Sequence, residues 1–134
     1  MDLNILKPSE LDESQSRLIG SCDRIANDIR LGIKVTKESD WAHLIEEGEY
    51  AEGDYLSAFD YLTDVLDIEY ITDSLKGYKS AEVLVAFGGP NIWIDLRNKE
   101  VRGFWGCDRY TAYFGDSEFY RELDEYLEEY FNCL

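Results

Sequence analysis

The sequence predicts an α+β fold in which N-terminal helices are followed by an antiparallel meander sheet of four to five strands and then by a C-terminal helix. Three observations predict this class of fold. Apolar residues recur at helical spacing as far as Asp67, alternate with a period of two from Ile68 to Phe114, and return to helical spacing over residues 116–131. The 134 residues contain no internal repeat and no low-complexity linker, so we expect a single domain over residues 1–134.

Three helices are expected before the strands. The first starts at the capping arrangement of Ser9 with Asp12 and stops at Gly32. The second is expected over residues 39–48 and the third over residues 54–67, each capped by its first residue. We expect their inward-facing side chains to be Trp41, Leu44, Ile45, Tyr55, Leu56, Phe59, Leu62, Val65 and Leu66.

Four strands are expected in "IEYITDS", "SAEVLVAF", "NIWIDLR" and "EVRGFWG", with a candidate fifth strand in "RYTAYF". Asn98-Lys99 and residues 75–78 supply short turns between neighbouring strands, and turns this short require antiparallel pairing. We expect helices to cover one face of this sheet. The candidate core residues are Leu84, Ile92, Ile94 and Leu123.

The turn Gly88-Gly89-Pro90 has two candidate roles. A phosphate-binding loop needs a glycine-rich turn that leads directly into a helix, whose backbone N–H groups meet the anion. Here the turn leads into "NIWID", which is a predicted strand. We therefore predict a structural turn in which the two glycines take positive φ. A ligand or partner contact made together with Trp93 and Trp105 is the alternative.

The balance of charge narrows the classes of partner. The chain carries 29 Asp and Glu against 13 Lys and Arg, a net charge of −16. A charge of this size keeps a protein in solution but repels itself in the compact state. We therefore expect no direct binding to nucleic acid or to an anionic lipid surface. A basic protein surface, a cationic ligand or a metal ion fits better, and an acidic composition without such a role is the alternative.

The negative charge is concentrated in two segments. Residues 38–73 hold 12 acids and no Lys or Arg, and residues 110–134 hold seven acids and one Arg. Where these segments are helical, acids four residues apart lie about 6 Å apart along the axis, which is of the order of the charge spacing along a nucleic-acid backbone. Like charges this close destabilise a helix by roughly a few tenths of a kcal/mol per pair, so we expect them to have a function elsewhere.

Groups that usually carry catalysis or bind metals are sparse. His43 is the only histidine, so a histidine cluster is excluded, and His43 acting as a lone general base is the catalytic alternative. Asp60, Asp64 and Asp67 are expected at i, i+4 and i+7 on one face of the third helix, without the glycine and alternating oxygens of a calcium-binding loop. We expect no enzyme activity, no cofactor and no metal.

The cysteines and the first residues bear on the cellular compartment. Cys22, Cys107 and Cys133 are widely spaced and lack the paired spacing of zinc ligands, so free thiols are expected. The opening "MDLNILKPSELDESQ" lacks the basic start and apolar run of a secretory signal. We expect a cytoplasmic protein, in the host cell cytoplasm if a phage encodes it.

The segment "LVAFGGPNIWIDLRNKEVRGFWG", followed by an acidic tail, resembles a segment of small proteins that phages and mobile elements carry in bacteria. The size and charge of the whole chain are similar to those of antirestriction and anti-CRISPR proteins, several of which act as nucleic-acid mimics. The resemblance covers under half of the chain. It implies an antagonist of a host defence nuclease and carries no site residues with it.

Three hypotheses of function follow from these observations. The first is a non-enzymatic acidic inhibitor, or nucleic-acid mimic, that binds a basic surface of a host defence nuclease or another nucleic-acid-binding protein. Its partner-binding residues would be Glu46, Glu47, Glu49, Glu52, Asp54, Asp60, Asp64, Asp67, Glu122, Asp124, Glu125, Glu128 and Glu129. The second is a small-molecule binding or catalytic module around Trp93, Asp95, Trp105 and Arg109 on the sheet. The third is an acidic housekeeping or toxin-neutralising partner without mimicry.

Overall fold

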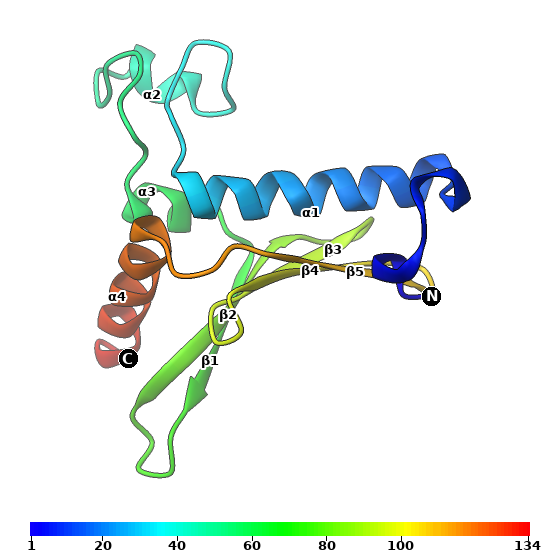
Figure 1. The fold of residues 1–134 in the computed structure, drawn as a ribbon. Coiled ribbons are helices and arrows are strands. Elements are labelled where there is room, and N and C mark those ends of the chain that lie inside the picture. Colours follow the sequence, from blue (N-terminus) through cyan, green and yellow to red (C-terminus); the bar gives the residue numbers. More distant parts are fainter.

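A computed structural model describes residues 1–134. The elements, with η for 3-10 helices, are η1 (Leu3–Ile5), η2 (Pro8–Glu10), α1 (Glu13–Leu31), α2 (Ala42–Glu46), α3 (Ala58–Thr63), β1 (Asp67–Thr72), β2 (Tyr78–Ala86), β3 (Asn91–Asp95), β4 (Glu100–Trp105), β5 (Asp108–Tyr113) and α4 (Glu118–Asn132). This order confirms the predicted α+β fold. In Figure 1, α1 lies along the sheet, and α2, α3 and α4 lie toward the end where α1 finishes.

The first helix is held by a capping box at its start. The Asp12 carboxylate accepts a hydrogen bond from the backbone N–H of Gln15 at 2.8 Å, and the Gln15 side chain accepts one from the backbone N–H of Asp12 at 3.0 Å. Ser9, which we expected to share in this cap, lies instead in η2. Gly32 ends the helix as predicted, because its φ of +81° is readily adopted only by glycine.

The five strands form one antiparallel sheet in the order β1-β2-β3-β4-β5, which is the predicted meander. Val83 pairs with Ile94, and Ile94 pairs with Val101, so three apolar side chains from neighbouring strands lie in a row on one face. The N-terminus extends the sheet, because Asp2 forms a parallel bridge with Arg109 at the outer edge of β5.

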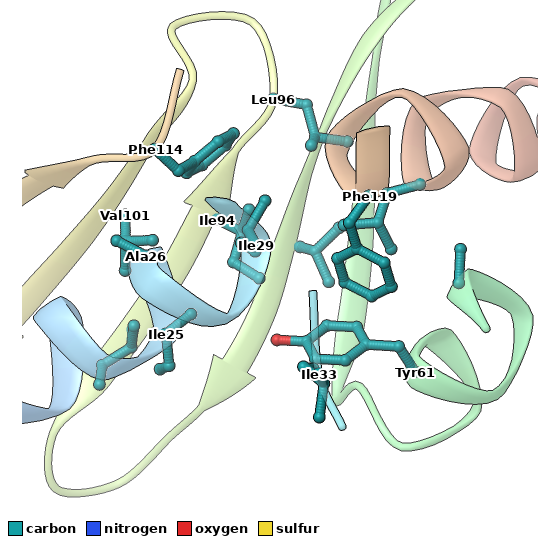
Figure 2. Packing of buried hydrophobic residues seen from close by; sticks show 14 of the residues in the cluster. Ile25, Ala26, Ile29, Ile33, Tyr61, Ile94, Leu96, Val101, Phe114 and Phe119 are labelled. Carbon is teal, nitrogen blue, oxygen red and sulfur yellow. The ribbon is translucent and has the colours of Figure 1, made fainter. Parts of the chain in front are cut away.

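The helices cover one face of the sheet and bury a cluster of 24 hydrophobic residues. Figure 2 shows Ile25 and Ile29 of α1 facing Ile94 and Val101 of the strands. The predicted core residues Ile92, Ile94 and Leu123 belong to this cluster. The approach of α1 is closest at β4, where a Cβ on Gly103 would lie 2.4 Å from the sulfur of Cys22.

Leu84, the fourth predicted core residue, is buried but lies outside this cluster. Its neighbours Val83 and Ile94 face the helices, and alternation along the strand therefore turns Leu84 to the opposite face. That face carries no helix and includes Glu82, Asp95 and Arg102, which we call the open face. The predicted alternation along the strand is correct, but alternation alone does not show which face of the sheet the helices cover.

The second and third helices are shorter than predicted. Ser39 does not cap α2, because its hydroxyl accepts from the backbone N–H of Thr36 and closes a turn before the helix begins. Ser57, and not Asp54, caps α3, and its hydroxyl accepts from the backbone N–H of Asp60 at 3.1 Å. Because α3 is only six residues long, it does not bury every predicted side chain. The exceptions, which are exposed, are Tyr55, Phe59 and Leu66.

The Gly88-Gly89-Pro90 segment is a turn between β2 and β3, as predicted. Gly88 and Gly89 have φ values of +94° and +154°, and the peptide bond before Pro90 is cis. A Cβ on Gly89 would lie 2.6 Å from the ring of Trp105, so both the backbone and the packing require glycine.

No helix of the structure is long and apolar enough to cross a membrane.

Candidate functional site

The first part of the first acidic segment, up to Leu56, lies in a loop that contains α2 and closes on itself. Backbone hydrogen bonds of 2.7 to 2.8 Å join Ile33 to Leu56 and link Val35 to both Gly53 and Asp54, while Leu44 is buried beneath the loop. The loop therefore presents its acidic side chains to solvent from a fixed base. Its exposed carboxylates without a hydrogen bond or ion pair include those of Glu46, Glu47 and Glu49.

Other acids of this segment have internal partners. The Asp60 carboxylate accepts hydrogen bonds from the hydroxyls of Tyr50 at 2.6 Å and Ser57 at 3.1 Å, which fixes the loop to the start of α3. Glu52 accepts from the backbone N–H of Lys37, and Asp54 accepts from the backbone N–H of Ala51 in its own turn. A partner reaches Asp60 only in competition with these bonds, whereas Glu52 and Asp54 are exposed.

The predicted helical row of Asp60, Asp64 and Asp67 is wrong. Asp60 lies in α3, Asp64 is the residue after its end, and Asp67 begins β1. The row fails because Ser57 starts the helix and Thr63 ends it, which leaves fewer than two turns. Only Asp64 of the three is both exposed and without a hydrogen bond, since Asp67 accepts from the backbone N–H of Ile68.

The second acidic segment forms α4, which starts at its N-cap Ser117. Its apolar side, with Phe119, Leu123 and Leu127, is buried, and Glu125, Glu128 and Glu129 are exposed without a hydrogen bond or ion pair. Burial and the nearby charges of Glu118 and Glu125 raise the pKa of Glu122. The helix therefore carries six acids against one arginine, Arg121, which pairs with an acid outside the helix.

Of the predicted partner-binding residues in α4, Asp124 is the one whose side chain makes a hydrogen bond. It accepts a hydrogen bond from the Tyr78 hydroxyl at 2.6 Å, and burial together with this bond raises the pKa of Tyr78. Tyr78 can reach α4 because the register between β1 and β2 shifts between Ile71 and Thr72, which leaves Lys79 unpaired and turns Tyr78 to the helix side. Sequence reasoning missed this bond, since the two residues are 46 positions apart.

The packing of α3 against α4 brings the two acidic segments to one end of the molecule. The rings of Phe59 and Tyr126 lie 6.1 Å apart, and those of Tyr61 and Phe119 meet edge to face at 5.6 Å. Figure 1 shows α2, α3 and α4 following one another along this end, away from the N-terminus. We call the exposed acids of residues 38–67 and of α4 the acidic end.

None of the 13 predicted partner-binding residues takes part in an ion pair. The one arginine of α4, Arg121, pairs with Asp116 before the helix begins, at 3.2 Å. Ten of the 13 are exposed, and Asp60, Glu122 and Asp124 are half-buried. The acidic end therefore has no internal neutralisation within ion-pair distance, which is the arrangement that a cationic partner would complete.

The four residues of the predicted sheet site do not share one face. Trp105 follows Val101 and Gly103 in alternation, so it points to the α1 side, where it lines a cavity with Leu18. Trp93 pairs with Arg102 on the open face, and alternation places Asp95 and Arg109 there as well. Asp95 is engaged within the chain, because its carboxylate accepts from the side chain of Asn98 at 2.8 Å and lies 3.6 Å from Arg102.

Arg102 is a charged residue of the open face that sequence reasoning missed. It pairs with Glu82 on β2 and Asp95 on β3, and its Nε is buried without a hydrogen-bond partner. Burial and the charge of Asp95 raise the pKa of the adjacent Glu100. The sequence signal was available, since Glu82, Asp95 and Arg102 each follow or precede an apolar residue of their own strand in alternation, namely Val83, Ile94 and Val101.

The remaining candidates for chemistry are separate from one another. His43 is exposed on α2 with its ring 6.4 Å from that of Trp41. The three cysteines are free, with Cys107 and Cys133 exposed and Cys22 buried. Burial, with a smaller effect of Asp23, raises the pKa of the Cys22 thiol to about 12, which disfavours the reactive thiolate, and Cys22 packs in the hydrophobic core.

In comparisons with known proteins, no family model, no curated protein and no solved structure matches this chain. Its function is therefore inferred from its own side chains, their partners and their charges.

Proposed function

We propose that this protein is a non-enzymatic inhibitor that acts as a nucleic-acid mimic. Its acidic end binds the basic surface with which a host defence nuclease, or another nucleic-acid-binding protein, holds DNA or RNA. An inhibitor of this kind is of the antirestriction or anti-CRISPR type. The carboxylates of the acidic end then take the place of phosphates in the partner's groove.

One observation carries this proposal. The contact between α3 and α4 brings together two acidic segments that are far apart in the sequence, and none of the 13 predicted residues pairs with a cation of the chain. Like charges held together in this way cost folding free energy, so their presence at one end is explained best by a partner that supplies the opposite charge. Glu46, Glu47, Glu128 and Glu129 contribute most directly, because they are exposed and make no internal hydrogen bond.

The test is competition with nucleic acid for one partner. A binding protein is isolated from the native host with the full chain as bait, purified, and assayed with labelled duplex DNA and with RNA at about 0.05 M and about 0.3 M salt. We expect this protein to displace the nucleic acid, and its own affinity to fall at the higher salt, because exposed charges are screened over about 8 to 10 Å near physiological ionic strength. Simultaneous binding of nucleic acid and this protein would contradict the proposal.

A charge-matched pair of variants locates the surface. Glu128→Lys with Glu129→Lys reverses two charges at the acidic end, and Glu10→Lys with Glu13→Lys reverses two exposed charges near the start of α1, at the other end of the molecule. We expect the first pair to weaken the complex by at least about tenfold and the second to change it much less, because short-range contacts add to the effect of net charge. Equal losses in both pairs would indicate attraction by net charge alone.

A further inference from the structure

A cavity of about 200 Å³ lies between α1, the segment before α2, the end of α3 and the end of β2. Arg24, Asp28, Asp40 and Asp64 contribute charged side chains to its wall, and Trp41 contributes an aromatic ring. None of these four charged side chains makes a hydrogen bond or an ion pair within the chain. The space exceeds the roughly 30 Å³ that one water occupies in the liquid, so it accommodates a group of several heavy atoms.

The Tyr61 side chain is buried, and its hydroxyl has no partner within the chain and remains accessible at this cavity. Tyr61 is only 8% exposed and lines the cavity, and its hydroxyl has no hydrogen bond within the chain. In Figure 2 this hydroxyl points away from α3, and Tyr61 lines the cavity together with Arg24 and Asp28 of α1. A polar group on a buried side chain normally has a hydrogen-bond partner, so the partner of this hydroxyl is a water or a polar ligand in the cavity.

The charge and shape of the cavity select the class of ligand. Three carboxylates outnumber the one guanidinium, and burial and Asp40 raise the pKa of Asp28, against an opposing effect of Arg24. No group of three or more carboxylates here comes close enough together to hold a metal ion. The rings of Trp41 and Tyr61 lie 6.1 Å apart at 34° and form an aromatic wall. Carboxylates combined with aromatic rings are the surroundings that bind organic cations.

We propose that this cavity binds a primary alkylammonium group. The ammonium donates hydrogen bonds to the surrounding carboxylates, with the Tyr61 hydroxyl as a further acceptor, while the alkyl chain lies against Trp41. An ammonium suits the site because it is a compact charge with three donors. Two sources supply this chemistry, a lysine side chain of a bound protein and a free polyamine. Only the lysine source rests on the proposed function, because the cavity borders the acidic end.

Titration of the whole protein with n-butylammonium chloride at constant ionic strength tests the site, with backbone amide and indole N–H signals followed by NMR. We expect saturable shifts centred on Trp41 and Tyr61. We also expect Arg24→Gln to strengthen binding by about two- to fivefold, because it removes a competing cation that makes no bond within the chain. Arg97→Gln is the matched control, since Arg97 is exposed, makes no hydrogen bond and does not line the cavity.

Two further variants remove favourable groups. Asp40→Asn is expected to weaken n-butylammonium binding by about two- to fivefold, and Tyr61→Phe to weaken it while the melting temperature is unchanged or higher. If the amide of lysine acetylated at its α-nitrogen binds more tightly than putrescine, the natural ligand is a lysine of a protein. The reverse order assigns a polyamine. Shifts that sodium chloride reproduces, equal effects of Arg24→Gln and Arg97→Gln, or tighter binding of ethylguanidinium would overturn the proposal. None of these measurements requires the partner of the proposed function.

Discussion

The helices α1 and α4 both bury an apolar side against the same sheet, yet their charges differ. Over its 19 residues α1 carries three acids and three arginines, whereas the 15 residues of α4 carry six acids and one arginine. In α1, Glu13 pairs with Arg17 and Asp23 accepts a hydrogen bond from Tyr110. In α4, Asp124 alone accepts a hydrogen bond from elsewhere in the fold. Packing on this sheet therefore does not require an acidic helix, and the charge of α4 needs another explanation.

The largest expected effect concerns the tight contact of α1 with the sheet. In Gly103→Ala, the new Cβ would lie 2.4 Å from the sulfur of Cys22 and 2.8 Å from Leu18 Cδ1, so α1 has to shift. We expect the free energy of unfolding to fall by about 1–3 kcal/mol, measured by urea denaturation.

The control for that variant is Gly20→Ala on the exposed side of α1, where a Cβ meets nothing within 4 Å. We expect this change to stabilise the protein by about 0.5–1 kcal/mol, because alanine favours a helix interior over glycine. If both substitutions had the same effect, α1 would not be packed on β4 as described.

The hydrogen bond from Tyr78 gives Asp124 a structural role that the other acids of α4 lack. In Tyr78→Phe, the ring keeps its contacts with Tyr70 and Phe131 while Asp124 loses the donor that lies 2.6 Å away. We expect a loss of about 1 kcal/mol in the free energy of unfolding. Tyr113→Phe, at an exposed tyrosine without a hydrogen bond, is the control and is expected to have little effect. Equal stability of the two variants would contradict a structural role for Asp124.

The smallest expected effect is the pH dependence of α4. The folded chain raises the pKa of Glu122 above 4.5, so it holds this proton more tightly than the unfolded chain does. The resulting stabilisation is present below pH 4.5 and is lost as the pH rises through the folded-state pKa. We expect thermal unfolding to show a decrease in stability as the pH rises above 4.5, and Glu122→Gln to reduce this slope.

The control for the pH series is Glu129→Gln, which removes an exposed carboxylate of the same helix. If Glu122→Gln and Glu129→Gln changed the slope equally, net charge and not the position of Glu122 would govern it.

The elements that sequence reasoning placed correctly are those with strong local signals. Gly32 ends α1 and the alternation of β2 to β5 yields the meander, because caps and strand periodicity act over a few residues. The third helix was placed wrongly because Asp54 and Ser57 are both good N-caps and the sequence does not rank them. The predicted set of 13 acids includes bonded and unbonded carboxylates, because the sequence shows neither that Asp60 bonds to Tyr50 and Ser57 nor that Asp124 bonds to the distant Tyr78.

The sequence by itself determined the α+β order of elements, the antiparallel meander and the concentration of acid in two segments. Only the tertiary structure decided which end those segments share, which face each tryptophan takes and which acids are bonded. The hydrogen bonds of Asp124 with Tyr78 and of Asp23 with Tyr110 span 46 and 87 positions of the chain. Such pairs depend on how distant segments return to each other in space, and periodicity within one segment contains no information about that distance.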